Sequence, residues 1–395
     1  MSRLFLIIGI LLLFATEILR VYFIMPFPGS QQANSIDMAY FIEQYKWLLR
    51  FIGVLLVVGP VYRLFTRKKI LPIILFSLVI ILYGVIFFFF NFRFVADKIF
   101  YQPTHKNFSP VKGNTIDSNK LVIGIEINGE ARAYPIQLIG YHHQVRDTLG
   151  NIPVMVTYCT VCRTGRVYSP FVNGKPETFR LVGMDHFNAM FEDETTKSWW
   201  RQVTGDAIAG PLKGKHLEEI PSRQASLASW LHLHPNSTIL QPDTIFKKDY
   251  DDLAGFDKGT VKSRLEKRDS ASWKMKSWVV GIKLNGIEKA YDWNDLLKVY
   301  FIQDTIGRQP ILLMLEKDTS SFHAFSRELN GQTLSFITYQ ELSQLIDSNT
   351  HSAWDQNGHC ISGTLKEAQL KPVPAYQEFW HSWKQFHPNT TQFKP

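Results

Sequence analysis

The stretch Ile152–Gly165, IPVMVTYCTVCRTG, combines a strand pattern with the densest group of reactive side chains in the polar part of the chain. Its first half is apolar and rich in β-branched residues, which predicts a buried strand. Cys159 and Cys162 follow at the end of that strand. Two thiols this close can share one metal ion or form one disulfide, so we treat this stretch as the candidate site.

The surroundings of this stretch recur later in the chain. Val122–Gly129 and Val279–Gly286 both alternate and then reach an Asn-Gly pair, which is the strongest short-range hairpin signal. Pro153 and Pro310 then precede an apolar run in each case. These shared features predict two tandem copies of one unit. Further pairs that agree are Asp147 with Asp304, Asn173 with Asn330, Trp230 with Trp383, and His234 with His387.

The two copies differ mainly at the thiols. In the shared register Cys159 falls opposite Glu316, and Cys162 falls opposite Thr319. His186 has no match in the second copy. The simplest interpretation is one active copy and one degenerate copy that supports it. We expect the shared His234 and His387 to be structural.

The fold class that we predict is a membrane-anchored α+β protein: three N-terminal transmembrane helices, then a β-rich extracytoplasmic part made of two tandem, diverged repeats. Each copy is expected to hold short strands, one short helix (135–140 or 293–299) and a terminal helix near Trp230 or Trp383. The limits that we expect are 1–95 for the transmembrane region (spans about 4–24, 47–66 and 70–92), 96–119 for a tether, 120–256 for the first repeat, 257–274 for a linker and 275–395 for the second repeat.

The N-terminal hundred residues contain three apolar runs. A helix needs about 20 apolar residues to cross the hydrocarbon core, and the run after Ile70 has no charge before Asn91. The first run has the positive start of a signal peptide but no small-residue cleavage site after it, so we expect an uncleaved helix. Glu17 and Arg20 lie in that run. The alternatives are a transport path and snorkelling to the outer interface, and we expect snorkelling because the other runs offer these two residues no polar partner.

Basic residues set the expected orientation. Arg3 and the loop Arg67–Lys69 belong on the inner side by the positive-inside rule, and the loop 26–45 carries no lysine or arginine. Three spans then place everything after about Val95 outside. We therefore expect a multi-pass protein of the bacterial inner membrane, with its polar part in the periplasm. The lipid bilayer is one expected partner, and a protein of the cell envelope is another.

The overall composition excludes two classes of protein. The net charge is +8, but the basic residues of the polar part are mixed with acidic ones, so we expect no nucleic-acid binding. Three cysteines are too few for a disulfide scaffold.

The candidate ligands are Cys159, Cys162 and His186, with His142 and His143 as further imidazoles. Two thiols with imidazoles suit a soft metal, which means copper or zinc. The same thiols suit thiol–disulfide exchange, in which Arg163 would lower the thiol pKa. The other interpretation is structural: the cysteines are a buried pair or a local disulfide in a non-enzymatic interaction module of an envelope complex. The sequence leaves the reaction open, and with it whether the chain is an enzyme.

The Tyr158–Cys162 stretch, the segment Ser198–Gly210 and His234-Pro235-Asn236 together resemble a prokaryotic family, domain of unknown function 3179. The resemblance is strong over about 119–240 and weak over 278–391. It implies an extracytoplasmic location and no established activity. This sequence departs from the family pattern by its second copy without cysteines and by the three preceding spans.

Overall fold

The computed structural model describes residues 2–340 and 344–395. The chain forms two compact units, and we describe each by itself. The first unit joins Met1–Tyr101 to Phe171–Leu217, and the second joins Gln102–Pro170 to Glu218–Pro395. The domain limits expected from the sequence follow the proposed repeat instead, and they stay a prediction.

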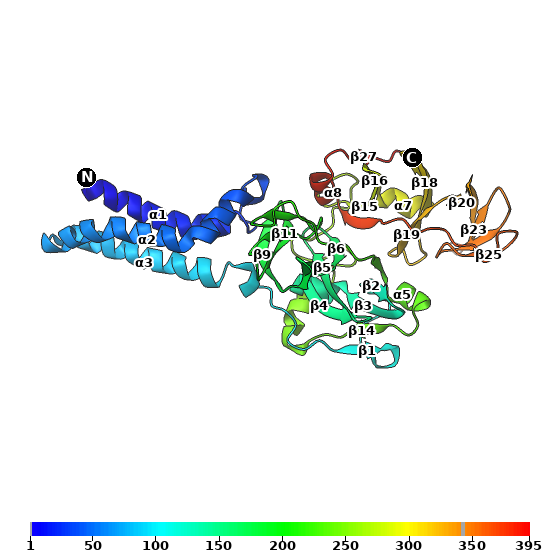
Figure 1. Ribbon diagram of the computed structural model, residues 1–395, viewed down its shortest axis with the longest axis horizontal. Coiled ribbons are helices and arrows are strands. Elements are labelled where there is room, and N and C mark those ends of the chain that lie inside the picture. Colours follow the sequence, from blue (N-terminus) through cyan, green and yellow to red (C-terminus); the bar gives the residue numbers. More distant parts are fainter. Residues whose placement is uncertain (1, 341–343) are drawn as a thin grey trace. The chain divides into compact units, whose positions relative to one another are not determined.

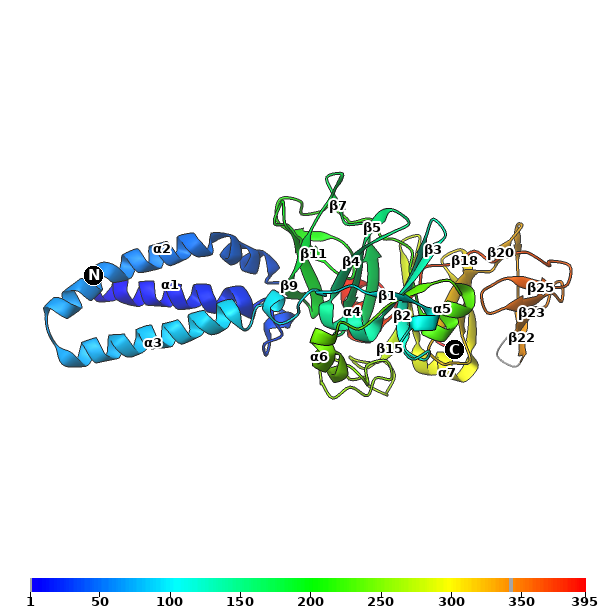
Figure 2. The ribbon, with the colours of Figure 1, turned by 90° about the horizontal axis from the view of Figure 1, so that it is seen from below.

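Three helices begin the first unit: α1 (Ser2–Tyr22), α2 (Ile36–Thr66) and α3 (Ile70–Phe92). All three are long and apolar enough to cross a membrane, as the sequence predicted. Figures 1 and 2 show α1 lying alongside the other two. At 31 residues, α2 is longer than the about 20 residues that a span requires. Its early part therefore extends beyond the predicted span.

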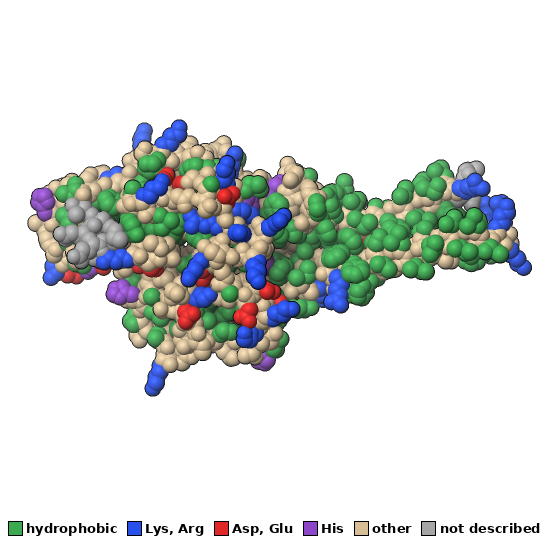
Figure 3. Space-filling model, turned by 180° about the vertical axis from the view of Figure 1, so that it is seen from behind, with side chains coloured by type: hydrophobic (Ala, Val, Ile, Leu, Met, Phe, Trp, Pro, Cys, Tyr) green, Lys and Arg blue, Asp and Glu red, His purple; other side chains and the backbone are tan. Residues whose placement is uncertain are grey.

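The outer face of the helices is apolar. Figure 3 shows hydrophobic side chains covering the helical segment, with Lys and Arg side chains gathered at its far end. None of the side chains of α3 is buried within the protein. Apolar surface of this extent marks contact with lipid or with another protein, so the helices are a possible membrane anchor.

A β-sheet completes the first unit. It has the order β12-β11-β10-β9 and is antiparallel throughout. The connection after α1 meets this sheet, because Met184 donates its backbone N–H to the Ile24 carbonyl at 2.7 Å. The ring of Tyr40 on α2 lies edge-on to Trp199, with centroids 5.1 Å apart. The further elements of this unit are η1 (Ser30–Gln32), η2 (Ala96–Lys98), β7 (Phe171–Val172), β8 (Lys175–Pro176), β9 (Phe179–Asp185), β10 (Asn188–Asp193), β11 (Trp199–Arg201) and β12 (Ala207–Ala209).

The second unit starts with a five-stranded sheet of order β1-β14-β3-β2-β13 and a three-stranded sheet of order β4-β5-β6. The β2–β3 hairpin turns at Asn128-Gly129, as the sequence predicted. The elements are β1 (Phe108–Pro110), η3 (Val111–Gly113), β2 (Leu121–Ile127), β3 (Glu130–Pro135), α4 (Ile136–His142), β4 (Gln144–Leu149), β5 (Ile152–Cys159), β6 (Thr164–Tyr168), β13 (Arg223–Ser226), α5 (Leu227–Leu233), β14 (Thr238–Leu240), η4 (Thr244–Phe246) and α6 (Lys247–Asp252).

The elements from β15 to β27, all in the later part of the second unit, follow the same order along the chain as the elements from β2 to β14. Its sheets run β26-β15-β16-β27, β17-β18-β19 and β22-β23-β24-β25. The elements are β15 (Trp278–Leu284), β16 (Ile287–Asp292), α7 (Trp293–Val299), β17 (Phe301–Ile306), β18 (Gln309–Leu315), β19 (Phe322–Ser326), β20 (Glu328–Leu329), β21 (Gln332–Thr333), β22 (Phe336–Gln340), β23 (Gln344–Asp347), β24 (Ala353–Asp355), β25 (Cys360–Ser362), β26 (Tyr376–Phe379), α8 (Trp380–Phe386) and β27 (Thr391–Gln392). This agreement supports the tandem repeat, which itself stays a prediction.

The same packing device recurs in both parts. A Cβ on Gly124 would lie 2.3 Å from the Trp230 ring, and one on Gly281 would lie 2.2 Å from the Trp383 ring. Only glycine lets each helix tryptophan sit this close to its strand. The rings of His234 and His387 lie against these tryptophans, 4.0 and 3.7 Å between centroids, in agreement with a structural role.

Candidate functional site

The two cysteines lie on one tight connection between β5 and β6. The register pairs Cys159 with Thr164, so Thr160 to Arg163 form the turn between the strands. Arg163 has a φ of 57°, the left-handed region that a bulky residue rarely adopts. We call Cys159–Arg163 the thiol turn. Its geometry follows from the strand that the apolar run 152–157 builds.

Both sulfurs are inside the protein. Cys159 and Cys162 each have 0% of their surface exposed, and they are not joined by a disulfide. Burial raises the pKa of the Cys162 thiol well above its ordinary value, and the hydrogen bond with Cys159 adds to this rise. Lys276 and Ser382 act in the opposite direction. Cys162 is therefore a protonated thiol at neutral pH, next to a cation that would favour a thiolate.

The second copy supplies the groups around the thiol turn. Lys276 Nζ donates to the Val161 carbonyl at 2.5 Å, and His381 Nε2 lies 3.1 Å from the same oxygen. The Phe379 N–H donates to the Cys162 carbonyl at 3.0 Å. Burial, with the Lys276 charge, lowers the pKa of His381 to about 3, so its ring is neutral at pH 7. Sequence reasoning missed Lys276 and His381, because they lie more than a hundred residues from the thiols.

A chain of polar contacts leads away from Cys162. Ser382, which acts on the Cys162 thiol, donates through Oγ to Glu378 Oε2 at 3.0 Å. Glu378 Oε1 accepts from Arg166 Nη2 at 2.5 Å. Burial alone would lower the pKa of Arg166, but the nearby Glu378 carboxylate keeps the Arg166 pKa above its ordinary value. A negative charge on the Cys162 sulfur would therefore lie beside buried polar groups and not in purely apolar surroundings.

Arg163, predicted to tune the thiols, points its guanidinium to other partners. Nε donates to Gln377 Oε1 at 2.9 Å, and the guanidinium carbon lies 3.9 Å from the centre of the Trp278 ring. The residue is 1% exposed, and burial lowers its pKa. Lys276 is the cation that acts on the Cys162 pKa.

The paired imidazoles His142 and His143 end α4. His142 Nε2 lies 2.7 Å from the Tyr250 hydroxyl, and His143 Nδ1 lies 3.0 Å from the Tyr141 carbonyl. Burial lowers the pKa of His143 to about 4. These contacts occupy one ring nitrogen of each histidine.

His186 belongs to the first unit, whereas the cysteines belong to the second. It lies in the β9–β10 turn with a φ of 50°, and its Nδ1 is 2.6 Å from Asp185 Oδ1. Arg201 also donates to Asp185, at 2.5 and 2.8 Å. Burial alone would raise the Asp185 pKa, but His186 and Arg201 hold it below the ordinary value.

The donor set limits which metal the site fits. In the described ranges 2–340 and 344–395, no group of three or more His, Cys, Asp or Glu side chains could hold a metal ion. Zinc in proteins takes four ligands in structural sites and three in catalytic ones, so the described residues do not fit it. Two thiolates alone are a donor set for copper(I), which prefers soft sulfur ligands.

The counterpart turn, Glu316–Ser320, holds an ion cluster where the first copy holds thiols. Glu316 Oε1 accepts from Ser229 Oγ at 2.6 Å and from Arg223 Nη2 at 2.9 Å, and it lies 2.6 Å from His323 Nε2. Burial alone would raise the Glu316 pKa, but these three partners hold it below its ordinary value. Arg223 and Ser229 come from the first copy, so each turn is completed by the other copy.

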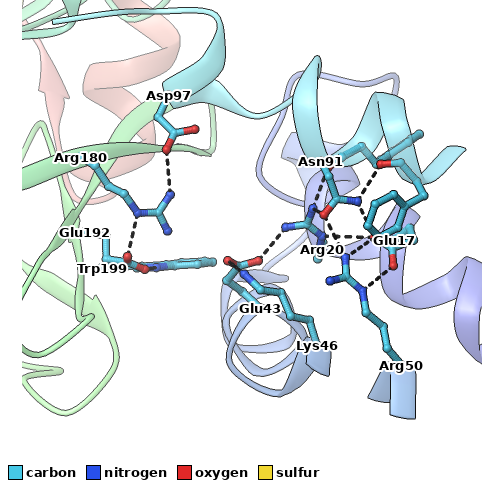
Figure 4. Close-up of polar contacts among 12 residues, drawn as sticks. Glu17, Arg20, Glu43, Lys46, Arg50, Asn91, Asp97, Arg180, Glu192 and Trp199 are labelled. Atoms are coloured by element: carbon cyan, nitrogen blue, oxygen red, sulfur yellow. Dashed lines mark hydrogen bonds and ion pairs between the residues drawn. The ribbon is translucent and has the colours of Figure 1, made fainter. Parts of the chain in front are cut away.

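A second buried polar cluster lies among the helices of the first unit (Figure 4). Glu17 is 0% exposed and accepts from Arg50 at 2.7 Å and from Asn91 Nδ2 at 2.8 Å. Arg20 donates to Glu43 at 2.9 Å and to Asn91 Oδ1 at 2.6 Å. The expectation that Glu17 and Arg20 snorkel is wrong, because α2 and α3 supply their partners.

The same cluster approaches the sheet of the first unit. Arg180 Nε donates to Glu192 Oε1 at 2.8 Å, and Asp97 lies 3.4 Å from Arg180 Nη1. Glu192 Oε2 accepts from Trp199 Nε1 at 2.9 Å. Figure 4 shows this second group of contacts beside the one around Glu17. Charged groups on β9 and β10 and on the segment after α3 thus meet at the end of the helices.

Fold and site define a β-rich protein with a possible membrane anchor and one buried dithiol. Residues 101–390 match the family described as Protein of unknown function (DUF3179). The match covers most of the chain, so the chain belongs to this family, as the resemblance implied. No curated protein and no solved structure matches the chain.

Proposed function

We propose that the chain is a multi-pass protein of the bacterial inner membrane whose periplasmic part carries a redox-active dithiol, Cys159 and Cys162. In the proposed reaction an external disulfide accepts two electrons and two protons and becomes two thiols. Cys159 and Cys162 lose the same two electrons and two protons and form one S–S bond. The external disulfide belongs to a protein partner of the envelope.

One observation carries this proposal: the two thiols contact each other inside a buried polar cluster that holds a cation. Lys276 lowers the Cys162 pKa against the effect of burial, and Ser382 does the same. Attack on a disulfide requires a thiolate, and Lys276 would stabilise the one that forms. The counterpart turn has a carboxylate in place of Cys159 and a hydroxyl in place of Cys162, so it has no such chemistry.

Apolar helices and basic ends support the proposed location. The loop between α2 and α3 contains Arg67, Lys68 and Lys69, which the positive-inside rule places in the cytoplasm. Three crossings then carry the β-rich part to the periplasm, an oxidising compartment where dithiols can cycle.

A redox titration of the full chain in detergent tests the proposal. The protein is equilibrated in glutathione buffers of graded potential, and its free thiols are then counted with a mass-adding maleimide. We expect one two-electron transition that C159S or C162S abolishes. The C360S variant is the matched control, because Cys360 is also buried and reduced. Thiols that stay reduced in the native protein over the whole range would overturn the proposal.

The same proposal has a metal form, in which copper(I) is held by Cys159 and Cys162. Purification under reducing conditions and metal analysis test it. Stoichiometric copper that disappears in the C159S/C162S double variant supports the metal form. If the protein holds no copper after incubation with a copper(I) complex, the metal form is ruled out.

Full burial of both sulfurs favours a second candidate function. In it the chain is a non-enzymatic interaction module of an envelope complex, and the cysteines only pack the turn. The redox titration separates the two. If the pair oxidises only after the protein is unfolded, the interaction module is supported.

A further inference from the structure

The second unit contains a cavity of about 650 Å³ that the thiol chemistry does not use. Pockets of roughly 300–1,000 Å³ are typical of small-molecule sites. Its wall combines the segment before β2, the linker after α6, and the helix α7 with the counterpart turn. The lining residues are Asp117–Lys120, Ser226, Ala228, Ala254, Asp257, Lys258, Arg268, Trp278, Trp293, Leu297 and Asp318–Ser320.

The cavity lies at the place that corresponds to the thiol cluster in the other copy. Alignment of Trp230 with Trp383 puts small side chains in the cavity wall where the thiol turn meets larger ones. Ser226 stands in the position of Phe379, and Ala228 in that of His381. Alignment of Val122 with Val279 likewise puts Asn119 in the position of Lys276. These larger side chains pack on the thiol turn, whereas their smaller equivalents leave space beside Thr319.

Unpaired hydrogen-bond donors line this space. Trp278 is 6% exposed, and its buried Nε1 has no hydrogen-bond partner among the described residues. The buried Nε of Arg268 has none either within the described part of the chain. A buried donor without an acceptor is destabilising, so two on one cavity wall point to a ligand that accepts from them.

Charged side chains of both signs line the cavity. Lys120, Lys258 and Arg268 line it, and so do Asp117, Asp257 and Asp318. The Asp318 carboxylate already accepts from the N–H groups of Ser320 and Ser321. Asp117 is exposed to solvent. Burial raises the pKa of Asp257.

The faces of the two tryptophan rings in the cavity wall are covered by other side chains. The guanidinium carbons of Arg163 and Arg268 lie 3.9 and 4.1 Å from the centre of the Trp278 ring. Trp293 is 1% exposed and packs edge-on against Trp278 and Phe322. A sugar that stacks on tryptophan would need a free ring face, so the wall does not suit one.

We propose that this cavity binds a small organic anion, whose carboxylate accepts hydrogen bonds from Trp278 Nε1 and Arg268 Nε. The apolar side of the ligand lies against Leu297. The inference is independent of the dithiol, because neither cysteine lines the cavity.

Calorimetric titration of the full chain in detergent, at low ionic strength, tests this site. The probes are benzoate and citrate, each paired with a neutral molecule, benzamide for benzoate and glucose for citrate. We expect at least one anion to bind with one site per chain, and both neutral molecules to fail. R268Q is expected to weaken that binding about tenfold, because it removes a charge-assisted hydrogen bond.

K262Q is the matched control: Lys262 is an exposed cation of the same linker and does not line the cavity. It is expected to bind the anion as the wild type does. Arg268 also donates to Asn294 at 2.6 Å, so the thermal midpoint of R268Q is measured too. If R268Q does not fold, the exposed K258Q replaces it, with a smaller expected loss. The proposal is overturned if neither anion binds, if a neutral partner binds equally well, or if the folded variant binds like K262Q.

Discussion

The thiol turn and the counterpart turn occupy the same place in two copies, yet they solve the same packing problem differently. Around Cys162 the other copy contributes Lys276 and His381 to neutral sulfurs. Around Glu316 the other copy contributes Arg223 and Ser229 to a carboxylate. A buried turn that is completed by residues from the other half of the chain is thus common to both places, and cysteine is present in only one of them. A cysteine pair that only one of the two turns carries is more simply explained by chemistry.

The largest expected effect is a loss of stability from a substitution in the counterpart turn. Glu316→Ala leaves Arg223 without its buried carboxylate, so we expect a loss of about 3–5 kcal/mol in the free energy of unfolding. Denaturant titration of the full chain in detergent measures it. Glu367→Ala, at an exposed side chain, is the control and should change stability by less than about 0.5 kcal/mol. Equal stability of the two variants would break the comparison.

The thiols themselves should matter less for stability. The C159S/C162S double variant puts hydroxyls in place of two buried thiols, in surroundings that include polar groups. We expect a loss of about 2 kcal/mol, smaller than that of Glu316→Ala, together with complete loss of the redox transition. Should the double variant prove less stable than Glu316→Ala, the thiol turn would be the structural one of the two.

The neutral histidine beside the thiols makes stability depend on pH. The folded pKa of His381, about 3, lies below the ordinary value of 6.5, so the unfolded state binds more protons between these values. Stability therefore falls as pH decreases through this window, by on the order of 1–2 kcal/mol between pH 7 and pH 5 for this residue. His143, with a pKa of about 4, contributes in the same direction.

The variant His381→Gln should show a shallower dependence of stability on pH than the wild type. Its counterpart variant, Ala228→Ser, should keep the wild-type slope. Denaturant titrations at pH 5 and pH 7 give both slopes. An unchanged slope for His381→Gln would show that His381 is not the group that titrates.

The smallest expected effect is on thiol reactivity. Lys276→Met removes the cation that lowers the Cys162 pKa, so the apparent thiol pKa should rise. The rate of alkylation by iodoacetamide as a function of pH, in a C360S background, measures this. Asn119→Ala, at the corresponding position beside the counterpart turn, should leave the rate profile unchanged. Equal profiles for the two variants would remove Lys276 from the site.

Local patterns in the sequence predicted the apolar helices, the Asn-Gly hairpins and the helices around Trp230 and Trp383. These features depend on spacing within a short window, which is why they can be derived from one chain. The groups that surround Cys162 depend on contacts across the copies. His381 could have been found from the sequence, because the aligned position in the first copy is Ala228 and the two copies therefore differ there.

Two other interpretations were made without long-range contacts. His186 was assigned to the candidate site because the second copy has no matching residue; the structure gives it Asp185 as a partner in the first unit, and its role as a ligand stays a prediction. Glu17 and Arg20 were judged helix by helix, and the packing of α1 against α2 and α3 supplied Arg50 and Asn91. Both cases require knowledge of which segments meet in space.

The reciprocal completion of the turns makes the halves of this protein dependent on each other. A fragment that ended before Lys276 would remove Lys276 and His381 from the Val161 carbonyl. It would also remove Gln377, which accepts a hydrogen bond from the Arg163 guanidinium. The same truncation would leave Arg223 with no carboxylate to meet. The later half of the chain therefore completes the thiol turn, although its own counterpart turn carries a carboxylate and not a thiol pair.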